Sequence, residues 1–252
     1  MSRVLAIANQ KGGVGKTTTA INLAAALAAL EHRTLVVDCD PQGTATRGLG
    51  LEAGHPNLYD VLAGEAPASE AIRPSGFPNL EVLPADRELV GAEIELAGLV
   101  GWEGRLRDAL APVRDAYGWV LVDTPPSLGR LTVLALTAAD GVLVPMQCEY
   151  FALEGVSELV STVARIGHVL RPGLAVEALV LTMYDDRMNL TRDVEAEVRG
   201  HFGDVVYRTV VPRNVRLAEA PSHGRPILQY DIKSRGAEAY LALARELAGR
   251  VR

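Results

Sequence analysis

The sequence predicts an α/β fold, a doubly wound and mostly parallel sheet of about seven strands with helices on both faces. Nearly continuous apolar runs rich in Val, Leu and Ile recur along the chain, as they do in strands that are covered on both sides. Patterns typical of helices separate these runs, and such helices are the crossovers that parallel strands require. No repeat, linker or low-complexity stretch interrupts the alternation, so we expect residues 1–252 to form a single domain.

The expected elements alternate along the chain. Strands are predicted at residues 4–8, 34–38, 80–84, 119–123, 142–147, 178–183 and 205–211. Helices are predicted at residues 17–30, 106–117, 154–170 and 190–202, and a further amphipathic helix is predicted at 236–252. The least regular stretch is 51–88, which contains Pro56, Pro67, Pro74 and Pro78.

The composition limits the classes of protein. A hydrophobic content of 48% and a charged content of 22% are those of a soluble globular protein. No apolar run is long enough to cross a bilayer, and the N-terminus leads into the first expected strand without a signal peptide. Cys39 and Cys148 lie far apart and outside any CxxC pattern, so we expect buried thiols and neither a disulfide nor a metal cluster. We therefore expect a cytoplasmic protein.

The charge is unevenly distributed. A net charge of −6 argues against indiscriminate binding to polyanions. Residues 185–252 carry 12 Lys and Arg against 10 Asp and Glu, whereas residues 1–184 carry 13 against 21. The C-terminal quarter is therefore the relatively basic part, although arginines scattered among acids usually form a solvated face.

The loop after the first expected strand has the sequence NQKGGVGKTT and covers residues 9–18. Its glycines allow successive backbone N–H groups to turn towards an anion, and the helix behind the loop adds the positive end of its dipole. Lys16 is placed to reach the outer phosphates of a nucleotide, and the Thr17 hydroxyl is placed to bind Mg²⁺. The loop therefore predicts a nucleotide phosphate site.

This loop departs from the pattern GxxxxGK[ST], because Gln10 takes the place of the first glycine and an additional lysine, Lys11, follows it. The chain contains only three lysines, Lys11, Lys16 and Lys233, and two of them lie in this loop. A compact ammonium group fits among phosphate oxygens where a guanidinium group is too large, so both lysines indicate phosphate chemistry.

Two carboxylates end predicted strands. Asp40, after the second strand, is placed to orient an attacking water or act as a general base, and the alternative is that it only initiates a turn before Pro41. Asp123, at the end of the fourth strand, suits Mg²⁺ bound through water. The stiff turn at residues 124–127 follows Asp123 and could sense a γ-phosphate.

These motifs identify a family. The chain resembles the ParA/Soj-type chromosome-partitioning ATPases of the ParA/MinD group, which have a deviant Walker A loop. The resemblance extends over nearly the whole chain through KGGVGKTTTAINLA, VDCDPQG, LVDTPPSLG, PMQCEYFALEG, LTMYD, VPRNVRLAEAPSHGRPI and SRGAEAYL. It implies ATP/ADP and Mg²⁺ as cofactors, an ATP-dependent homodimer, weak intrinsic ATP hydrolysis, nonspecific binding to double-stranded DNA, a ParB-type protein partner and association with the nucleoid.

The resemblance also implies a role for individual residues. Lys11 would act across the dimer interface, Lys16 would bind phosphate and Asp40 would be the catalytic carboxylate. The nucleotide loop comprises Lys11, Gly12, Gly13, Val14, Gly15, Lys16, Thr17 and Thr18, with Asp123 beside it. The implied magnesium site comprises Thr17, Asp40 and Asp123, and the segment against the adenine comprises Pro212, Arg213 and Asn214.

The implied DNA contacts are Arg187 and Arg216. The alternative for these arginines is that Arg187 pairs with Asp185 or Asp186, and Arg216 with Glu219. Two departures from the family are modest: residues 31 and 32 are Glu-His where Gly-Lys is common, and Thr44 replaces a common Asn.

Two other functions use the same kind of loop. A MinD-like ATPase binds membrane through a C-terminal amphipathic helix, but the stripe of Tyr240, Leu241, Ala244 and Leu247 is dominated by small residues, so we expect it to pack on the sheet and expect no membrane partner. A metabolic ligase resembling dethiobiotin synthetase needs a second substrate pocket. Only the stretch 51–88 offers room for one, and it has no recognisable catalytic pattern.

Overall fold

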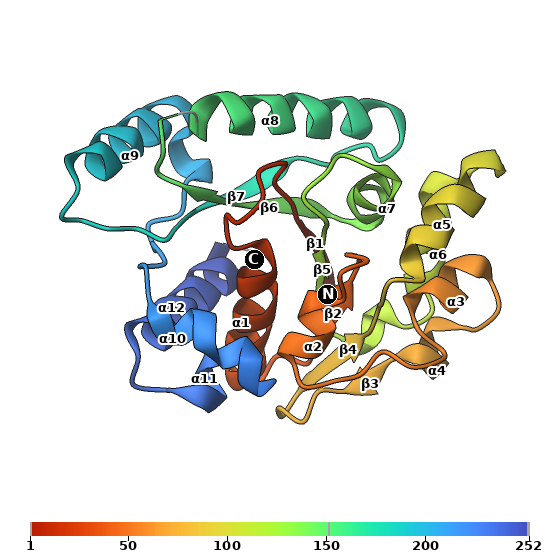
Figure 1. The fold of residues 1–252 in the computed structure, drawn as a ribbon. Helices are drawn as coiled ribbons and strands as arrows, with labels where there is room; N and C mark the ends of the chain where they lie inside the picture. The colour runs from red at the N-terminus through yellow and green to blue at the C-terminus, as the bar shows by residue number, and fades with distance from the viewer. Residues whose placement is uncertain (1, 151, 251–252) are drawn as a thin grey trace.

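A computed structural model describes residues 2–150 and 152–250 and contains a seven-stranded sheet (Figure 1). The strand order is β3-β4-β2-β5-β1-β6-β7, and every pair is parallel except β3 with β4. The strands are β1 (Arg3–Ile7), β2 (Thr34–Asp38), β3 (Arg73–Pro74), β4 (Leu80–Leu83), β5 (Trp119–Asp123), β6 (Gly141–Gln147) and β7 (Val176–Thr182). The predicted fold class is confirmed.

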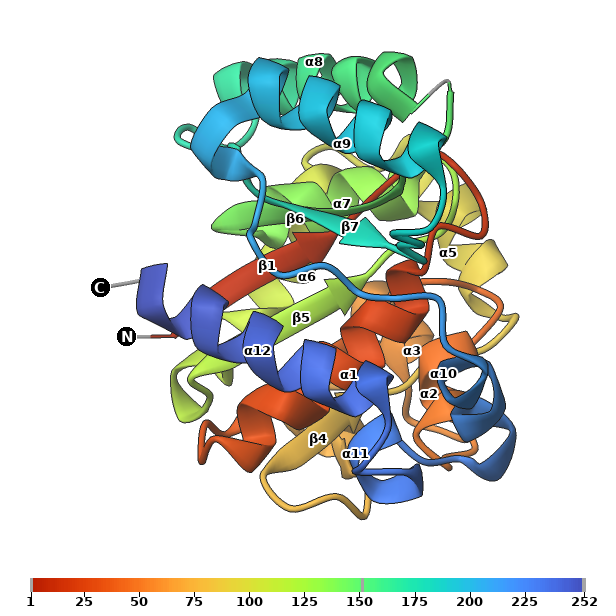
Figure 2. The same cartoon turned by 90° about the vertical axis from the view of Figure 1, so that its left-hand side faces the viewer.

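Helices cover both faces of the sheet, as the two views show (Figures 1 and 2). One face carries α1 (Lys16–Ala29), α2 (Thr44–Gly48), α10 (Val215–Glu219), α11 (Ile227–Tyr230) and α12 (Arg235–Arg250). The other carries α7 (Arg130–Ala138), α8 (Ala152–Val169) and α9 (Asn189–Phe202), and its core continues through α3 (Leu58–Ala63), α4 (Ala68–Ala71), α5 (Leu89–Glu95) and α6 (Arg105–Leu110). Each face therefore has its own apolar core, separated by the sheet.

The strand expected at residues 205–211 does not form. The segment runs beside β7 and makes isolated bridges at Val206 and Pro212, but it is not a regular strand. The Glu246 carboxylate of α12 accepts the backbone N–H groups of Arg208 and Thr209, both at 2.9 Å. Because these amides are bound to a side chain, the segment cannot continue a ladder with β7.

Two further expectations need correction. The helix expected at 106–117 ends at Leu110, because Pro112 has no N–H group to continue it and a short 3₁₀ turn at Arg114–Ala116 follows. The seventh strand is instead β3, which contains a proline and lies at the sheet edge, where a missing donor is tolerated.

The C-terminal helix α12 packs against α1 within the core that covers one face of the sheet. Tyr240, Ala244 and Leu247 are buried, as expected for a packed stripe, and Leu241 is partly buried. The Tyr240 hydroxyl lies 3.1 Å from the Thr19 hydroxyl of α1. In the described parts of the chain, no helix is both long and apolar enough to span a bilayer. Met1, Phe151 of the motif PMQCEYFALEG, Val251 and Arg252 lie outside the described residues.

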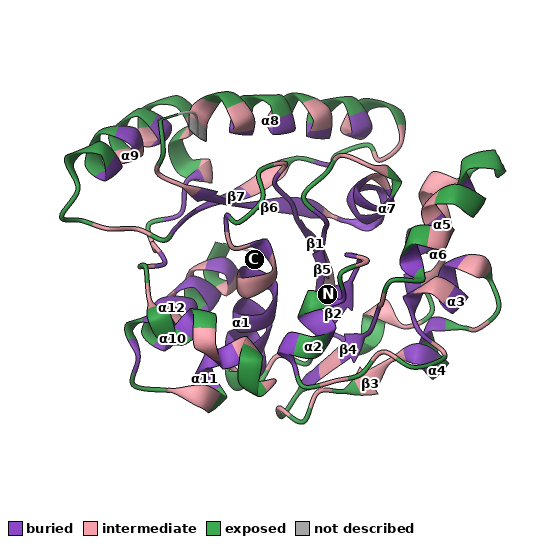
Figure 3. Cartoon of the chain, in the orientation of Figure 1, coloured by how far each residue is buried: buried purple, intermediate pink, exposed green. Residues whose placement is uncertain are grey.

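The carboxyl ends of the central strands converge on one place. Asp38 of β2 lies beside Asp123 of β5, which lies beside Ile7 of β1. All three residues are fully buried, and the central strands of the sheet are purple in Figure 3. The chain continues from Ile7 into the glycine-rich loop, so this loop and both carboxylates meet at the edge where ligands of open α/β sheets bind.

Candidate functional site

The glycine-rich loop has the backbone of an anion cradle. Gly13 and Gly15 have φ angles of 75° and 86°, in the left-handed region that favours glycine. A Cβ atom at Gly13 would meet nothing within 4 Å, so the backbone conformation and not crowding requires glycine there. Gly15 precedes the first residue of α1, whose free N–H groups therefore face the loop.

Three polar side chains hold the loop in position. The Asn9 amide donates to a backbone carbonyl of β6 at 2.7 Å. The Thr182 hydroxyl, at the end of β7, donates to the Val14 carbonyl at 2.8 Å, and the Gln147 amide, at the end of β6, donates to the Gly13 carbonyl at 2.9 Å. Sequence reasoning did not assign these roles. For Gln147 and Thr182 the available signal was their position at strand ends, in the motifs PMQCEYFALEG and LTMYD.

The two lysines of the loop have different environments. Lys16 is 7% exposed, and its ammonium donates to the Lys11 carbonyl at 3.1 Å. Burial lowers the pKa of Lys16, while Asp123 and Asp40 oppose that decrease. The Lys11 side chain is half exposed and its ammonium forms an ion pair with Glu149, in the loop after β6. Lys16 therefore lies within the site, whereas Lys11 lies at its solvent side.

Asp123 is a buried carboxylate without a hydrogen-bond partner among the described residues. Burial raises the pKa of Asp123 well above its usual value and the Asp38 carboxylate raises it further, while Thr17 and Lys16 oppose the increase. Asp38 is also fully buried, but it accepts hydrogen bonds from the Thr46 amide and hydroxyl at 2.8 and 2.7 Å. Among the described residues, Asp38 therefore has hydrogen-bond partners and Asp123 has none.

Asp40 lies at the entrance to the same site. Its side chain is 8% exposed and accepts the Gln42 amide at 2.8 Å, and its carbonyl accepts the Gly43 amide at 2.8 Å. It therefore initiates the turn before α2, as the alternative stated. Its carboxylate also lies close enough to Lys16 to oppose the decrease in the pKa of that ammonium, so both sequence-based roles are compatible with its position.

The residues present fit a magnesium ion. Two carboxylate oxygens of Asp123 are buried and unpaired within the described chain, the Thr17 side chain lies close enough to lower the pKa of Asp123, and other carboxylates crowd the same place. A buried carboxylate in this setting is stabilised by a cation. Residues 2–150 and 152–250 contain no group of three or more His, Cys, Asp or Glu arranged to hold a metal. The fit to Mg²⁺ rests on the donors themselves, because carboxylate and hydroxyl oxygens suit this ion, which takes few protein ligands and keeps water and phosphate oxygens.

A cavity of about 320 Å³ adjoins the loop. Pro212, Arg213 and Asn214 line one side of it, and Thr18 and Tyr240 line the side towards α1. Asn214 holds its segment in place, because its side chain accepts the Arg216 amide at 2.8 Å and begins α10. The cavity is mostly apolar and lies beside the phosphate cradle, as a site for a flat heterocycle must.

Arg187 and Arg216 form ion pairs on the surface. The Arg187 guanidinium contacts Asp185 at 2.6 and 2.8 Å, and that of Arg216 contacts Glu219 at 2.9 Å. Both pairs are those of the alternative stated above. The Arg187 side chain is 84% exposed and that of Arg216 is 54% exposed, and exposed pairs of this kind contribute only about 0–1 kcal/mol. Both guanidinium groups thus remain accessible to a phosphate.

Known proteins are similar to this chain over most of its length. A family model described as AAA domain matches residues 2–176. The chromosome partitioning protein ParA of Caulobacter vibrioides is 55% identical over 254 residues, covering 99% of this chain and 95% of that protein. The sporulation initiation inhibitor protein Soj of Bacillus subtilis is 52% identical over 250 residues, covering 98% of this chain and 99% of that protein.

Two solved structures are also similar over nearly the whole chain. The cell division ATPase MinD of Pyrococcus furiosus has a TM-score of 0.84 and 28% identity, and the match covers 100% of both chains. A cobyrinic acid a,c-diamide synthase from Mycobacterium smegmatis, with bound ADP and magnesium, has a TM-score of 0.86 and 38% identity, and the match covers 98% of this chain and 94% of that one.

Proposed function

Because this chain belongs to the ParA/Soj family of chromosome-partitioning ATPases, we propose that it is an ATP-dependent switch that dimerises, binds DNA without sequence preference and hydrolyses ATP slowly until a ParB-type protein stimulates it. Its cofactors are ATP or ADP and Mg²⁺, and it acts in the cytoplasm on the nucleoid. Residues 1–252 act as one domain. One observation carries the proposal: the loop at residues 9–18 lies beside the carboxylate of Asp123, which is buried and has no hydrogen-bond partner in the described parts of the chain.

The loop and its neighbours hold the nucleotide. The backbone from Lys11 to Thr18 surrounds the phosphates, and Lys16 replaces its hydrogen bond to the Lys11 carbonyl with bonds to the outer phosphate oxygens. Thr17, Asp123 and Asp40 would hold Mg²⁺, and the bound ion would neutralise phosphate charge. Pro212, Arg213 and Asn214 enclose the adenine in the apolar cavity.

Hydrolysis depends on assembly. Asp40 orients the attacking water or accepts its proton, since it lies at the entrance to the site near Lys16. Lys11 is on the solvent side, where its ammonium can reach the nucleotide of a second subunit. A cation that arrives only in the closed dimer stabilises the charge that develops on the γ-phosphoryl oxygens. Hydrolysis of the bound ATP therefore limits the lifetime of the dimer.

DNA binding also depends on the dimer. Arg187 and Arg216 supply phosphate contacts, and a two-fold dimer presents two copies of each along one face. This doubling allows a chain of net charge −6 to bind a polyanion.

Steady-state ATPase rates measured with and without duplex DNA and a ParB-type protein test the proposal. We expect strong stimulation only when both are present, and no activity from Lys16→Ala, which loses the main counter-charge to the outer phosphates. Equal rates in all four conditions would contradict the switch. Near-normal ATP affinity of Lys16→Ala would contradict the nucleotide site.

A synthase remains a second candidate because the similar Mycobacterium smegmatis structure carries that name. It requires turnover that depends on a small second substrate and is indifferent to DNA. A MinD-like membrane function is disfavoured by the buried stripe of α12, and co-sedimentation with liposomes in the presence of ATP tests it.

A further inference from the structure

Helix α5 presents an apolar face that is not buried in this chain. Leu89 and Ala92 are buried in the core, whereas Val90 and Ile94, one turn apart on another side of the helix, are 48% and 72% exposed. Val100, shortly after the helix, is fully exposed. In Figure 3 the end of α5 projects from the molecule in green. Neighbouring exposed apolar side chains of this size indicate an interaction surface.

The sequence that contains this face is strongly acidic. Residues 51–104 contain ten Asp and Glu and two Arg, a balance of −8, whereas the rest of the chain contains 21 Asp and Glu and 23 Lys and Arg, a balance of +2. Glu88, Glu93 and Glu95 lie on or next to α5 itself. This short stretch therefore carries the whole negative balance of the protein.

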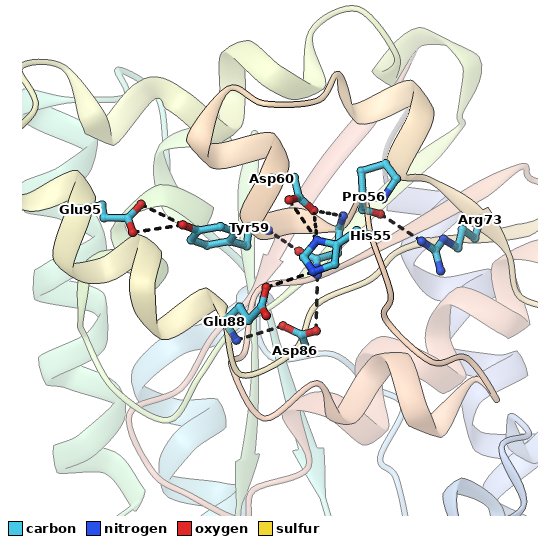
Figure 4. Close-up of polar contacts among 9 residues, drawn as sticks. His55, Pro56, Tyr59, Asp60, Arg73, Asp86, Glu88 and Glu95 are labelled. Atoms are coloured by element: carbon cyan, nitrogen blue, oxygen red, sulfur yellow. Dashed lines mark hydrogen bonds and ion pairs between the residues drawn. The ribbon is translucent and has the colours of Figure 1, made fainter.

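Other side chains hold two of these carboxylates in place (Figure 4). The Tyr59 hydroxyl donates to Glu95 at 3.1 Å, and the His55 ring lies 3.2 Å from Glu88. His55 also pairs with Asp60 of α3 at 2.8 Å. The carboxylates beside the apolar face are thus partly ordered, which reduces the entropy lost when a partner binds.

The charge determines what can cover this face. In a symmetric contact between two copies, each α5 would meet the acidic surroundings of the other, and juxtaposed like charges are unfavourable. A basic partner gains attraction from the same carboxylates. We propose that an acidic docking face, comprising Val90, Ile94, Val100, Glu88, Glu93 and Glu95, binds a basic amphipathic segment of a partner protein. In the proposed function this partner is the ParB-type protein. Only this identification of the partner rests on the proposed function.

The docking face lies next to the nucleotide machinery. The Glu93 carbonyl accepts a hydrogen bond from the Arg130 guanidinium at 3.2 Å, and Arg130 is the first residue of α7. The turn at residues 124–127, expected to sense the γ-phosphate, lies just before α7. A Cβ atom at Gly129 would lie 2.8 Å from the Glu93 carboxylate, so the two segments are in close contact. A partner on α5 can therefore influence the turn without entering the site.

Peptide binding and ATPase stimulation together test the inference. The probes are a labelled leucine–lysine amphipathic helix and its leucine–glutamate counterpart, measured by fluorescence anisotropy, and a purified ParB-type protein in the ATPase assay. The variants are Val90→Ser and Ile94→Asp, with Ile232→Asp as the control because Ile232 is 65% exposed in a different part of the chain. Circular dichroism checks that each variant is folded.

We expect the basic peptide to bind the wild type and the control at least about tenfold more tightly than it binds Ile94→Asp, and the acidic peptide to bind none of them. ParB-type stimulation should fall in parallel, with basal hydrolysis unchanged. Equal peptide binding by all variants would overturn the docking face, and so would loss of the ATP-dependent dimer in Ile94→Asp, which would assign the face to a second copy. If the ParB-type protein fails to stimulate the wild type while Ile94→Asp still loses the peptide, the docking face stands and the proposed partner is wrong.

Discussion

Lys11, the lysine proposed to act on a partner's nucleotide, forms an ion pair with Glu149 of its own chain. Both side chains are about half exposed, at 49% and 50%. Glu149 follows β6, whose last residue, Gln147, also holds the loop through the Gly13 carbonyl. The same segment therefore supports the loop and pairs with its outer lysine, and this pair must open before Lys11 reaches a second subunit.

Glu149→Gln should favour the dimer. Removing the carboxylate frees the Lys11 ammonium in each subunit. Two exposed pairs of about 0–1 kcal/mol each then no longer oppose dimerisation, so the dimer dissociation constant with ATP should fall by up to about 30-fold. Analytical ultracentrifugation with ATP and Mg²⁺ measures this constant. Glu154→Gln, in the next helix, is the matched control, and weaker dimerisation of Glu149→Gln would show that Glu149 supports the closed state instead.

Lys11→Ala and Asp40→Ala should separate dimerisation from hydrolysis. Lys11→Ala should bind ATP yet remain monomeric, because the contact across the interface is lost. Asp40→Ala should bind ATP and persist as a dimer, because water is no longer positioned. Size-exclusion chromatography with ATP and Mg²⁺ distinguishes them, and identical profiles for the two variants would contradict the roles proposed.

The stability of the nucleotide-free protein should depend on pH through Asp38. Burial raises the pKa of Asp38 to about 6 from an ordinary value near 3.8, so the folded state binds a proton more tightly than the unfolded state. The stabilisation is present below about pH 4 and is lost as the pH rises through about 6, on the order of 3 kcal/mol in total.

Urea unfolding across this pH range should therefore show that the free energy of unfolding of the wild type falls more steeply with pH than that of Asp38→Asn. The variant also lacks the charge that raises the pKa of Asp123, and this acts in the same direction. Parallel pH profiles for the two proteins would show that the Asp38 carboxyl titrates alike in the folded and unfolded states.

Glu246→Ala should destabilise the protein by about 1–3 kcal/mol, because two backbone N–H groups at residues 208 and 209 lose their acceptor. Glu238→Ala, on an exposed position of the same helix, is the control and should change stability by less than about 0.5 kcal/mol. Chemical denaturation measures both. If the control loses as much stability as Glu246→Ala, the substitutions weaken helix α12, and the lost hydrogen bonds to residues 208 and 209 are not the cause.

Glu246 also shows where sequence reasoning reached its limit. Strands β1, β2, β4, β5, β6 and β7 were predictable because buried parallel strands are continuous apolar runs. Residues 205–211 have the same composition, but a carboxylate 38 residues away along the chain takes the Arg208 amide. That contact is tertiary, and no local pattern contains it. Strand β3 was missed because two residues carry no periodicity.

For the candidate site, too, the local signals could be read from the sequence, whereas the tertiary contacts could not. The loop at residues 9–18, Asp40 and Asp123 were found because spacing and strand ends are local signals, and the family predicted from the motifs is confirmed by ParA and Soj relatives. Gln147, Thr182 and Glu149 were not assigned roles, because only the folded sheet brings the ends of β6 and β7 to the loop. The roles of Arg187 and Arg216 remain predictions, since each has an acidic neighbour that offers another explanation.

Arg187 and Arg216 should both contribute to DNA binding. An exposed pair with Asp185 or Glu219 is weak enough to be exchanged for a phosphate, so the pairs and a DNA site are compatible. ATP-dependent binding to a random duplex should be insensitive to sequence and should weaken steeply with salt. Arg187→Ala or Arg216→Ala should each reduce the magnitude of the log K against log salt slope by about 2, one per contact in each subunit of the dimer.

Asp185→Asn separates the two explanations further. It removes the ion pair of Arg187 with Asp185, so it should strengthen DNA binding if Arg187 contacts phosphate, because the guanidinium no longer has to leave that carboxylate. Fluorescence anisotropy over a salt series measures affinity and slope, with Arg165→Ala on α8 as the control for total charge. If Arg187→Ala and Arg216→Ala dimerise normally and match the control in both quantities, the two arginines are surface ion pairs alone and the DNA site lies elsewhere.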